Sequence, residues 1–456
     1  MNAARKSARV PRGLALALAL LAIVAGCLNQ PKTVETNPAV DAYKTSLGSF
    51  KDEVKDHADT LFADGQKIFR YDTFGSEAFW GDQLRLHHAI TGEKFGGVGP
   101  GLPAKQALEL GIKADIAKLP RILLEAIKGG SVSLEKPETT IELLKADAIV
   151  GVKAIVNDGR ITSVGITCAL CHSTVDDSFA KGIGRRLDGW PNRDLDVGAV
   201  VALAPNLKPY MDLLGQSESE VRRVLRSWGP GKYDAELDKD GKAFRPDGQS
   251  AATMIPAAFG LAGQNLHTYG GWGGVPYWNA YVGITQMHGS GTFFDPRLND
   301  ARKFPIAARL KTWNIRPAQD LVTAKLPALH YYQLSIPAPK PKPDSFDAAA
   351  ARRGKDLFAG KAKCATCHVP PLYSEPGYPI HQAAEIGIDD FQAQRSPTGG
   401  YRTTPLNGLF VREKGGFYHD GRFKDYAAVL DHYQSVLNFQ LNTQERQDLI
   451  EFLKSL

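Results

Sequence analysis

Two short segments, CALCH at 168–172 and CATCH at 364–368, carry the residues best suited to chemistry in this chain. Each has two cysteines three positions apart and a histidine directly after the second: Cys168, Cys171, His172 and Cys364, Cys367, His368. The chain has 5 cysteines and 11 histidines in 456 residues, so roughly one chance match is expected in a thousand such chains. A redox dithiol, a zinc site and a covalently attached haem all use cysteines at this spacing.

The surroundings of the two segments discriminate among these uses. A dithiol oxidoreductase site normally opens a helix after a strand of a βαβ unit, and neither segment has that frame. A Cys₄ zinc site would need both pairs to share one ion, and it would leave both histidines unexplained. Covalent haem uses all six residues, because the cysteines form thioethers and the histidine becomes the proximal iron ligand. We therefore predict two covalently attached c-type haems.

Residues 1–27 have the pattern of a bacterial export signal. Basic residues precede an apolar run at 14–24, which ends in small residues before Cys27,. The run has 11 residues, too few to cross a bilayer. The segment VAGC resembles a lipobox, which predicts diacylation of Cys27, and Leu28 favours sorting to the outer membrane; an ordinary signal with a chance cysteine is the alternative. We expect a periplasmic, lipid-anchored protein with a flexible tether at 28–40.

Composition excludes several classes of partner. Removing the four basic residues before position 13 lowers the formal net charge from +6 to +2, which is too weak a balance to indicate nucleic acid. No other run is apolar enough to span a membrane, so we expect membrane contact through the lipid anchor only. Hydrophobic and charged contents of 43% and 23% are those of a globular protein,.

The segments that must position the two motifs divide into two domains. A proline-rich linker at 335–344 separates an N-terminal haem domain at 41–334 from a C-terminal cytochrome c domain at 345–456,. We predict a mainly α fold: two cytochrome c-like helical haem domains with long ordered loops and a short β-hairpin in the first. TMIPAAFGL at 253–261 parallels TTPLNGLF at 403–410, which indicates that the two halves are distant copies.

Local patterns locate the elements of each domain. In the first, helical spacing covers 41–69, 104–130 and 217–228, and alternating β-branched residues around Asp158-Gly159 predict a hairpin at 148–167. The Gly- and aromatic-rich stretch 229–300, including 268–291, is expected to be a long loop. In the second, an Ala-rich helix should end near Gly360, and Thr443 can cap a C-terminal helix. The first of these helices resembles the opening helix of class I cytochrome c domains, which implies that Gly354 and Phe358 pack on the C-terminal helix.

The sixth iron ligand decides whether a haem transfers electrons or binds a small molecule. No methionine follows the linker, so His432 is our first choice for the C-terminal haem and Tyr433 the second, ahead of His419 and His381. For the N-terminal haem, Met287 and His288 are the nearest candidates. The further alternatives are Met254, His267, the pair His87-His88 and an open position. Three arginines, Arg185, Arg186 and Arg193, could bind haem propionates, and Trp190 or Trp272 could lie between the haems.

The paired motifs, together with RTTPLNGLF and GGFYHDGRFKDYAAVLDHY before a terminal helix, resemble the bacterial dihaem cytochrome c peroxidase superfamily. The resemblance implies one haem that meets peroxide and a second that supplies it with electrons. The methionine that commonly ligates the second haem falls at Tyr433, and the methylamine-dehydrogenase maturation enzyme carries a tyrosine there. The dihaem rubber oxygenase is similar too, with a haem open to dioxygen.

Two functions follow as expectations. The first is a peroxidase-like oxidoreductase, in which the C-terminal haem relays electrons to an N-terminal haem that meets peroxide or dioxygen. The second is a periplasmic electron carrier with both haems six-coordinate. Either function requires a redox partner, such as a small cytochrome or a cupredoxin.

Overall fold

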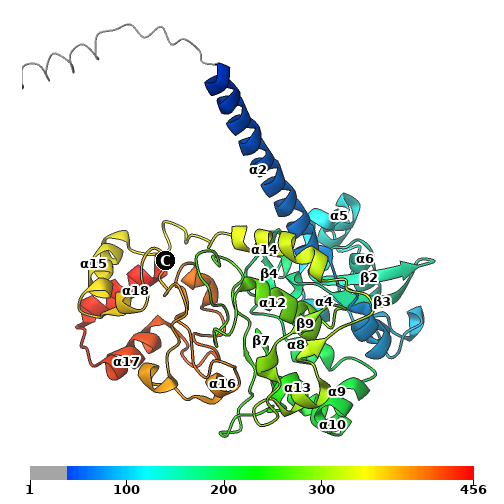
Figure 1. Ribbon diagram of the computed structural model, residues 1–456. Helices are drawn as coiled ribbons and strands as arrows, with labels where there is room; N and C mark the ends of the chain where they lie inside the picture. Colours follow the sequence, from blue (N-terminus) through cyan, green and yellow to red (C-terminus); the bar gives the residue numbers. More distant parts are fainter. Residues whose placement is uncertain (1–37) are drawn as a thin grey trace, which may run out of the picture. The chain divides into compact units, whose positions relative to one another are not determined.

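The computed structural model describes residues 38–456; the predicted leader, its Cys27 and residues 28–37 of the tether lie outside the described residues. The chain divides into two compact units, Met1–His57 and Ala58–Leu456. One continuous helix, α2 (Pro38–Tyr71), crosses this division (Figure 1). It corresponds to the helix predicted at 41–69, but it begins earlier and takes in the last three residues of the predicted tether.

Helices dominate the described residues, and the strands form five two-stranded sheets. The longest strands, β2 (Val152–Asn157) and β3 (Arg160–Ile166), pair antiparallel. Asp158 and Gly159 between them have φ values of 49° and 72°, the positive values that tight Asp-Gly hairpin turns require. The mainly α class and the hairpin are thus confirmed. From residue 38 onward, no helix is both long and apolar enough to cross a bilayer.

The predicted helix at 104–130 is wrong, because the chain breaks there into shorter elements. The segment forms α4 (Ala104–Glu109), β1 (Ala114–Asp115), a 3₁₀ turn and α5 (Arg121–Lys128). Gly111 has a φ of 85° and packs so closely on Asp194 that a Cβ would lie 2.2 Å from its carbonyl carbon. Pro120 then lacks the amide hydrogen that a continuous helix would need.

The stretch predicted as a loop at 268–291 also needs correction. It contains α12 (Val275–Tyr281), which continues into the π-helical segment η4 (Val282–Gln286). Buried aromatic side chains on α12, among them Trp278 and Tyr281, hold the helix in the core. The helix predicted at 217–228 is present as α10 (Glu218–Arg226), with Ser217 as its cap.

In the C-terminal part, α15 (Ala348–Ala359) packs on α18 (Thr443–Lys454) as predicted. A Cβ on Gly354 would lie 2.0 Å from the carbonyl oxygen of Asp448, so only glycine allows this approach. The rings of Phe358 and Phe452 lie 5.1 Å apart. The cap of α18 is Asn442 rather than Thr443: its side chain accepts from the amide of Glu445, whose carboxylate accepts from Asn442 in a capping box,.

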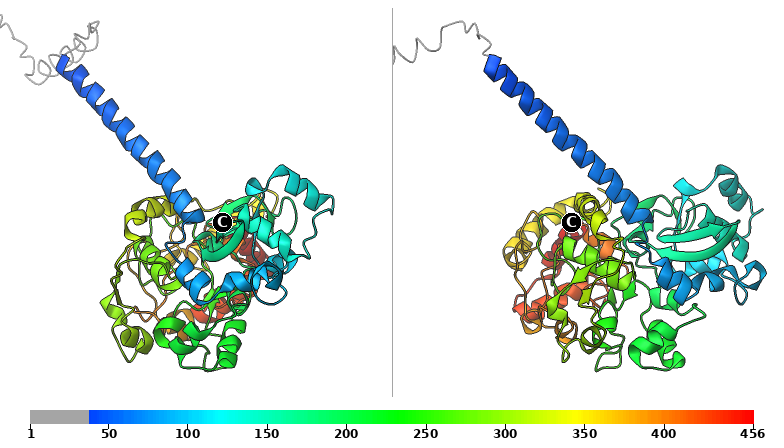
Figure 2. Two further views of the ribbon diagram at one scale, coloured as in Figure 1. Left: turned by 90° about the vertical axis from the view of Figure 1, so that its right-hand side faces the viewer. Right: turned by 45° about the vertical axis from the view of Figure 1, so that its right-hand side comes forward.

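We call residues 58–334 the N-terminal lobe and 345–456 the C-terminal lobe (Figures 1 and 2). Each lobe has its own buried apolar cluster, and the C-terminal one is built around Phe358, Leu449 and Phe452. An ion cluster joins the lobes: Arg395 donates to Asp234 at 2.7 Å and to Asp240 at 2.8 Å, with none of the three side chains exposed. The predicted linker lies between α14 (Leu326–Ser335) and α15.

The two lobes repeat one turn, as the sequence parallel suggests. Residues 267 and 273 form an isolated β-bridge in the first lobe, and 417 and 423 form the same bridge in the second. Thr268 and Tyr418, one residue into each turn, both have positive φ, 63° and 70°. A helix follows in each lobe, α12 in the first and α17 (Tyr426–Leu437) in the second.

Candidate functional site

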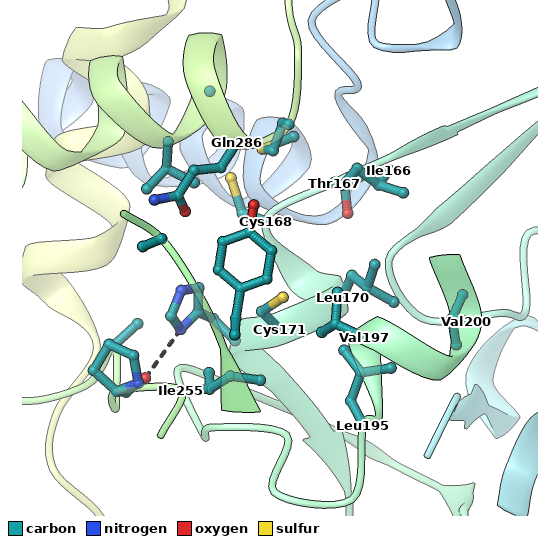
Figure 3. A pocket seen from close by; sticks show the side chains of 18 of the residues that line it. Ile166, Thr167, Cys168, Leu170, Cys171, Leu195, Val197, Val200, Ile255 and Gln286 are labelled. Atoms are coloured by element: carbon teal, nitrogen blue, oxygen red, sulfur yellow. Dashed lines mark hydrogen bonds between the residues drawn. The ribbon is translucent and has the colours of Figure 1, made fainter. Parts of the chain in front are cut away.

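The first C-x-x-C-H segment forms a single helical turn between two strands. Cys168 precedes α7 (Ala169–His172), and β4 (Ser173–Val175) follows it. Gly151 lets the hairpin approach this turn, because a Cβ there would lie 2.1 Å from the amide nitrogen of Leu170. The turn places both cysteines and His172 on one apolar cavity, and Figure 3 shows Cys168 and Cys171 beside Leu170 in its wall.

The hydrogen bonding and burial of the polar groups in this turn suit metal ligation better than thiol exchange. His172 donates from Nδ1 to the carbonyl oxygen of Pro256 at 3.1 Å, which leaves Nε2 free to ligate. Burial lowers the pKa of His172 to about 4, so the ring is neutral. Burial also raises the pKa of Cys168 and Cys171 to about 12. Redox dithiols have a lowered thiol pKa, the opposite of the shift at these two cysteines.

The second segment repeats this arrangement in the C-terminal lobe. The 3₁₀ turn η7 (Cys364–Thr366) follows α15 and places Cys364, Cys367 and His368 on a second cavity. His368 donates from Nδ1 to the carbonyl oxygen of Tyr373 at 3.0 Å, and burial lowers its pKa. Since each cysteine pair lines its own cavity, the two pairs do not form one Cys₄ zinc site.

The two cavities share part of their walls. Six residues line both of them: Pro256, Ala257, Leu261, Thr268, Tyr269 and Arg402. Tyr269 is the aromatic member of this shared wall. The tryptophans expected between the haems line neither cavity: Trp190 packs on Phe410 at 6.0 Å, and Trp272 on Trp278 at 5.0 Å. The prediction that Trp190 or Trp272 lies between the haems was therefore wrong.

Three arginines, Arg193, Arg402 and Arg412, line the second cavity. No carboxylate among residues 38–456 forms an ion pair with any of them, and Arg193 has two buried nitrogens without a hydrogen-bond partner. Burial lowers the pKa of Arg402 to about 9 and that of Arg412 to about 10. Unpaired cations in apolar surroundings are costly, so this wall calls for an anionic ligand. Haem propionates supply two carboxylates that match arginine forks.

The other two arginines expected at propionates have protein partners instead. Arg185 pairs with Asp176 at 2.9 Å, and Arg186 with Asp115 at 3.1 Å. Of the three predicted residues, only Arg193 therefore reaches a cavity, and it is the second cavity rather than the first. The residues present thus fit a c-type haem in each cavity: two cysteines, a neutral histidine and, for the second, three cations.

The structure does not bring His432 to the second cavity. Its Nε2 lies 2.8 Å from the carbonyl oxygen of Ile386, on a different face of α17. Tyr433, the second choice, lines the cavity, and burial raises its pKa. His381 and His419 also line the cavity; His381 is held by Glu375 at 2.6 Å, and His419 stacks on Tyr401 at 5.2 Å. We therefore prefer Tyr433 to His432 as the candidate sixth ligand of the C-terminal haem.

The structure also distinguishes the candidates for the sixth ligand in the first cavity by whether they line it. Met287 lines the cavity, as do Met254 and His267, whereas the pair at 87–88 does not. His288 points elsewhere, because its ring stacks on Phe79 with the centroids 3.5 Å apart. His267 is engaged through Nε2 with the carbonyl oxygen of Leu261 at 3.0 Å. Met287 and Met254 are thus the predicted ligands that line this cavity with no hydrogen bond to their sulfur among the described residues.

Sequence reasoning missed one residue of the first cavity, Glu236. It is the only Asp or Glu in the described wall, it is 5% exposed, and its Oε2 has no hydrogen-bond partner. Burial, opposed by Arg395, raises its pKa to about 7. The sequence around Glu236, DAELDKD, is acidic and is typical of a solvated surface segment. No pattern in the sequence distinguishes it from its neighbours.

Comparison with known proteins gives one similar sequence and several distant structures. No family model matches the chain. The methylamine utilization protein MauG of Methylorubrum extorquens is 32% identical over 125 residues, which cover 24% of this chain and 35% of that protein. The match thus spans about a third of the relative's length.

Solved structures add weaker likenesses. A MauG-like protein associated with microbial copper homeostasis is 19% identical with a TM-score of 0.30, covering 47% of this chain and 76% of that one. The diheme peroxidase BthA from Burkholderia thailandensis is 14% identical with a TM-score of 0.30, covering 51% and 78%. TM-scores this low do not establish a shared fold. The likeness to part of the methylamine utilization protein and the two C-x-x-C-H segments, each on its own cavity, agree with the resemblance to the bacterial dihaem cytochrome c peroxidase superfamily.

Proposed function

We propose that this chain is a dihaem c-type cytochrome with peroxidase-like oxidoreductase activity. Cys168 and Cys171 would hold one haem through thioethers with His172 as proximal ligand, and the residues 364, 367 and 368 would hold the second in the same way. Bound haem would supply a redox-active iron in each cavity. The observation that carries the proposal is the pair of similar cavities with a shared wall.

The two haems have different tasks in this proposal. Tyr433, which lines the second cavity, would be a ligand of the haem held there, and that haem would supply an electron relay. The haem held by His172 would supply the centre that binds peroxide or dioxygen. Glu236 supports this direction, because a carboxyl with a pKa of about 7 can hold a proton and release it near neutral pH. Tyr269 in the shared wall lies where electrons would pass between the haems.

One observation favours a second candidate, a non-catalytic electron carrier. Met287 lines the first cavity, and its thioether could fill the sixth position of the N-terminal haem, as in electron-transfer cytochromes. Both haems would then be six-coordinate, and peroxide would have no open site.

The proposed location is the periplasmic side of the outer membrane, through diacylation of Cys27. The leader pattern and the lipobox-like VAGC segment support it,. A small cytochrome or a cupredoxin is the proposed redox partner.

Electron paramagnetic resonance of the purified protein, oxidised and half-reduced, separates the two functions. A high-spin ferric signal from about half of the haem, altered by peroxide, is expected for the enzyme. Two low-spin haems in both states would support the carrier. Intact-mass measurement after acid-acetone extraction tests the common premise: two haem adducts should remain, and fewer than two would overturn both functions.

A further inference from the structure

The first part of α2 carries an exposed apolar seam. All residues from 38 to 57 are exposed. The seam consists of five large apolar side chains that are 45, 64, 48, 63 and 53% exposed: Val40, Tyr43, Leu47, Phe50 and Val54. Gly48 weakens the helix within this segment, and a row of exposed apolar side chains is a surface that a partner could cover.

The spacing of the seam identifies the kind of partner. The steps between its members alternate as three, four, three and four residues, and the same alternation continues to His57 and Leu61. This is the heptad repeat of a coiled coil, with an apolar residue at each a and d position from Val40 to Val54 and His57 at the next d position,. It is narrower than the apolar stripe of a helix that packs on a globular core. The partner is thus another helix with a matching seam.

The charges beside the seam argue against a lipid surface. Residues 38–57 contain four acidic residues and three lysines, a net charge of −1. Helices that lie on membranes have a wide apolar face and a polar face rich in lysine and arginine. Neither property is present in this segment.

We propose that residues 40–57 form a parallel coiled coil with a second copy of this chain. Identical seams complement one another, and two-fold homodimers are the commonest assemblies. Charge selects the parallel arrangement. Lys44 and Lys51 occupy e positions, where an antiparallel pair would bring lysines of the two copies together, whereas a parallel pair places Lys51 opposite the uncharged Ser46 of the second copy,. Anchoring both copies to one membrane surface at Cys27 would favour the same direction.

Sedimentation velocity of the haem-loaded protein without the predicted leader and Cys27, residues 28–456, tests the pairing. The protein should sediment as a dimer at micromolar concentration, and Phe50→Asp should raise the dissociation constant at least about 100-fold. Ser49→Asp is the matched control, since it adds the same charge one residue away, off the seam, and should leave the dimer intact. Haem content should be unchanged in both variants, so this outcome is independent of the proposed function.

A cysteine at an a position tests the direction. Val54→Cys should form an intermolecular disulfide on oxidation if the helices are parallel and in register, and none if they are antiparallel. A monomeric parent protein, or equal weakening by Phe50→Asp and Ser49→Asp, would overturn the proposal. So would binding of the parent protein to phosphatidylglycerol vesicles that Phe50→Asp abolishes, because the occupant of the seam would then be lipid.

Discussion

The two cavities are alike where the protein would attach haem and different where a small molecule would bind. In both, one turn supplies two cysteines and a histidine whose Nδ1 donates to a backbone carbonyl. Elsewhere the first cavity presents Met287 and the protonatable Glu236, and the second presents Tyr433 and unpaired arginines. Covalent haem attachment would fix the geometry of these turns, so under the proposed function the two lobes could differ only on the remaining walls.

The largest expected effect comes from removing one attachment pair. Cys168→Ala with Cys171→Ala should leave one haem per chain, and Cys364→Ala with Cys367→Ala should leave the other, because each pair lines its own cavity. Haem per chain is measured by the pyridine haemochrome assay. Loss of both haems from either variant would show that the two lobes cannot load separately.

Glu236→Gln should remove the proton-handling group of the first cavity alone. Peroxide turnover should fall by about 10²- to 10⁴-fold, and the inflection near the pKa of about 7 should disappear from the pH profile. Glu385 lies on the wall of the second cavity, so Glu385→Gln is the matched control. This variant should retain both the peroxide turnover and the inflection in the pH profile. An unchanged profile in Glu236→Gln would remove Glu236 from the proposed chemistry.

The same carboxyl should make stability depend on pH. Its pKa is raised from 4.5 in the unfolded chain to about 7 in the folded protein, so the folded state binds the proton more tightly. The resulting stabilisation is complete below pH 4.5 and is lost as the pH rises through about 7,. Glu236→Gln should flatten this part of the stability curve, as measured by denaturant unfolding at several pH values.

Arg395→Met tests whether the lobes depend on their buried ion cluster. Removing this cation leaves Asp234 and Asp240 unpaired, which should cost about 3–5 kcal/mol of unfolding free energy. The exposed pair of Arg446 with Asp431 provides the comparison, and Arg446→Ala should cost less than about 1 kcal/mol. Equal losses in the two variants, measured by denaturant unfolding, would contradict a special role for the cluster.

Tyr433→Phe and His432→Gln decide which residue of α17 serves the C-terminal haem. The first should change the low-spin signal in electron paramagnetic resonance, because Tyr433 lines the cavity. The second should leave it unchanged, since His432 bonds to the carbonyl of Ile386. The opposite result would restore the preference derived from sequence.

The smallest effect is expected at the shared wall. Tyr269→Ala should slow electron equilibration between the haems without removing either, whereas Trp190→Phe should not change it, because Trp190 lines neither cavity. Stopped-flow spectroscopy after partial reduction measures the rate. Identical rates in both variants would exclude Tyr269 from the path.

Sequence was most informative where a feature depends on a few adjacent residues. The Asp158-Gly159 turn follows from backbone conformation alone. The packing of Gly354 against Asp448, by contrast, was expected only from the resemblance to class I cytochrome c domains. The break at 104–130 was missed because Gly111 ends the first helix through its contact with Asp194, which is distant in sequence.

The inward face of α17 shows the limit of periodicity. His432 and Tyr433 are adjacent, and each shares its face of the helix with apolar residues. The cavity face carries Val429, Tyr433 and Leu437, whereas His432 lies beside Gly387 on a face covered by another segment. Because two faces of this helix are covered by other segments, the sequence pattern is consistent with either face lining the cavity. Only the tertiary packing shows which face does so.

The six residues common to both cavities give the two sites one shared boundary. If each cavity holds a haem, a change of charge or ligand on one side would act on Arg402 and Tyr269, which also line the other side. Coupling of this kind is reciprocal: whatever the reduction of one iron does to ligand affinity at its neighbour, that ligand must do, in equal measure, to the reduction potential of the first. Titration of either centre alone would therefore report on the pair.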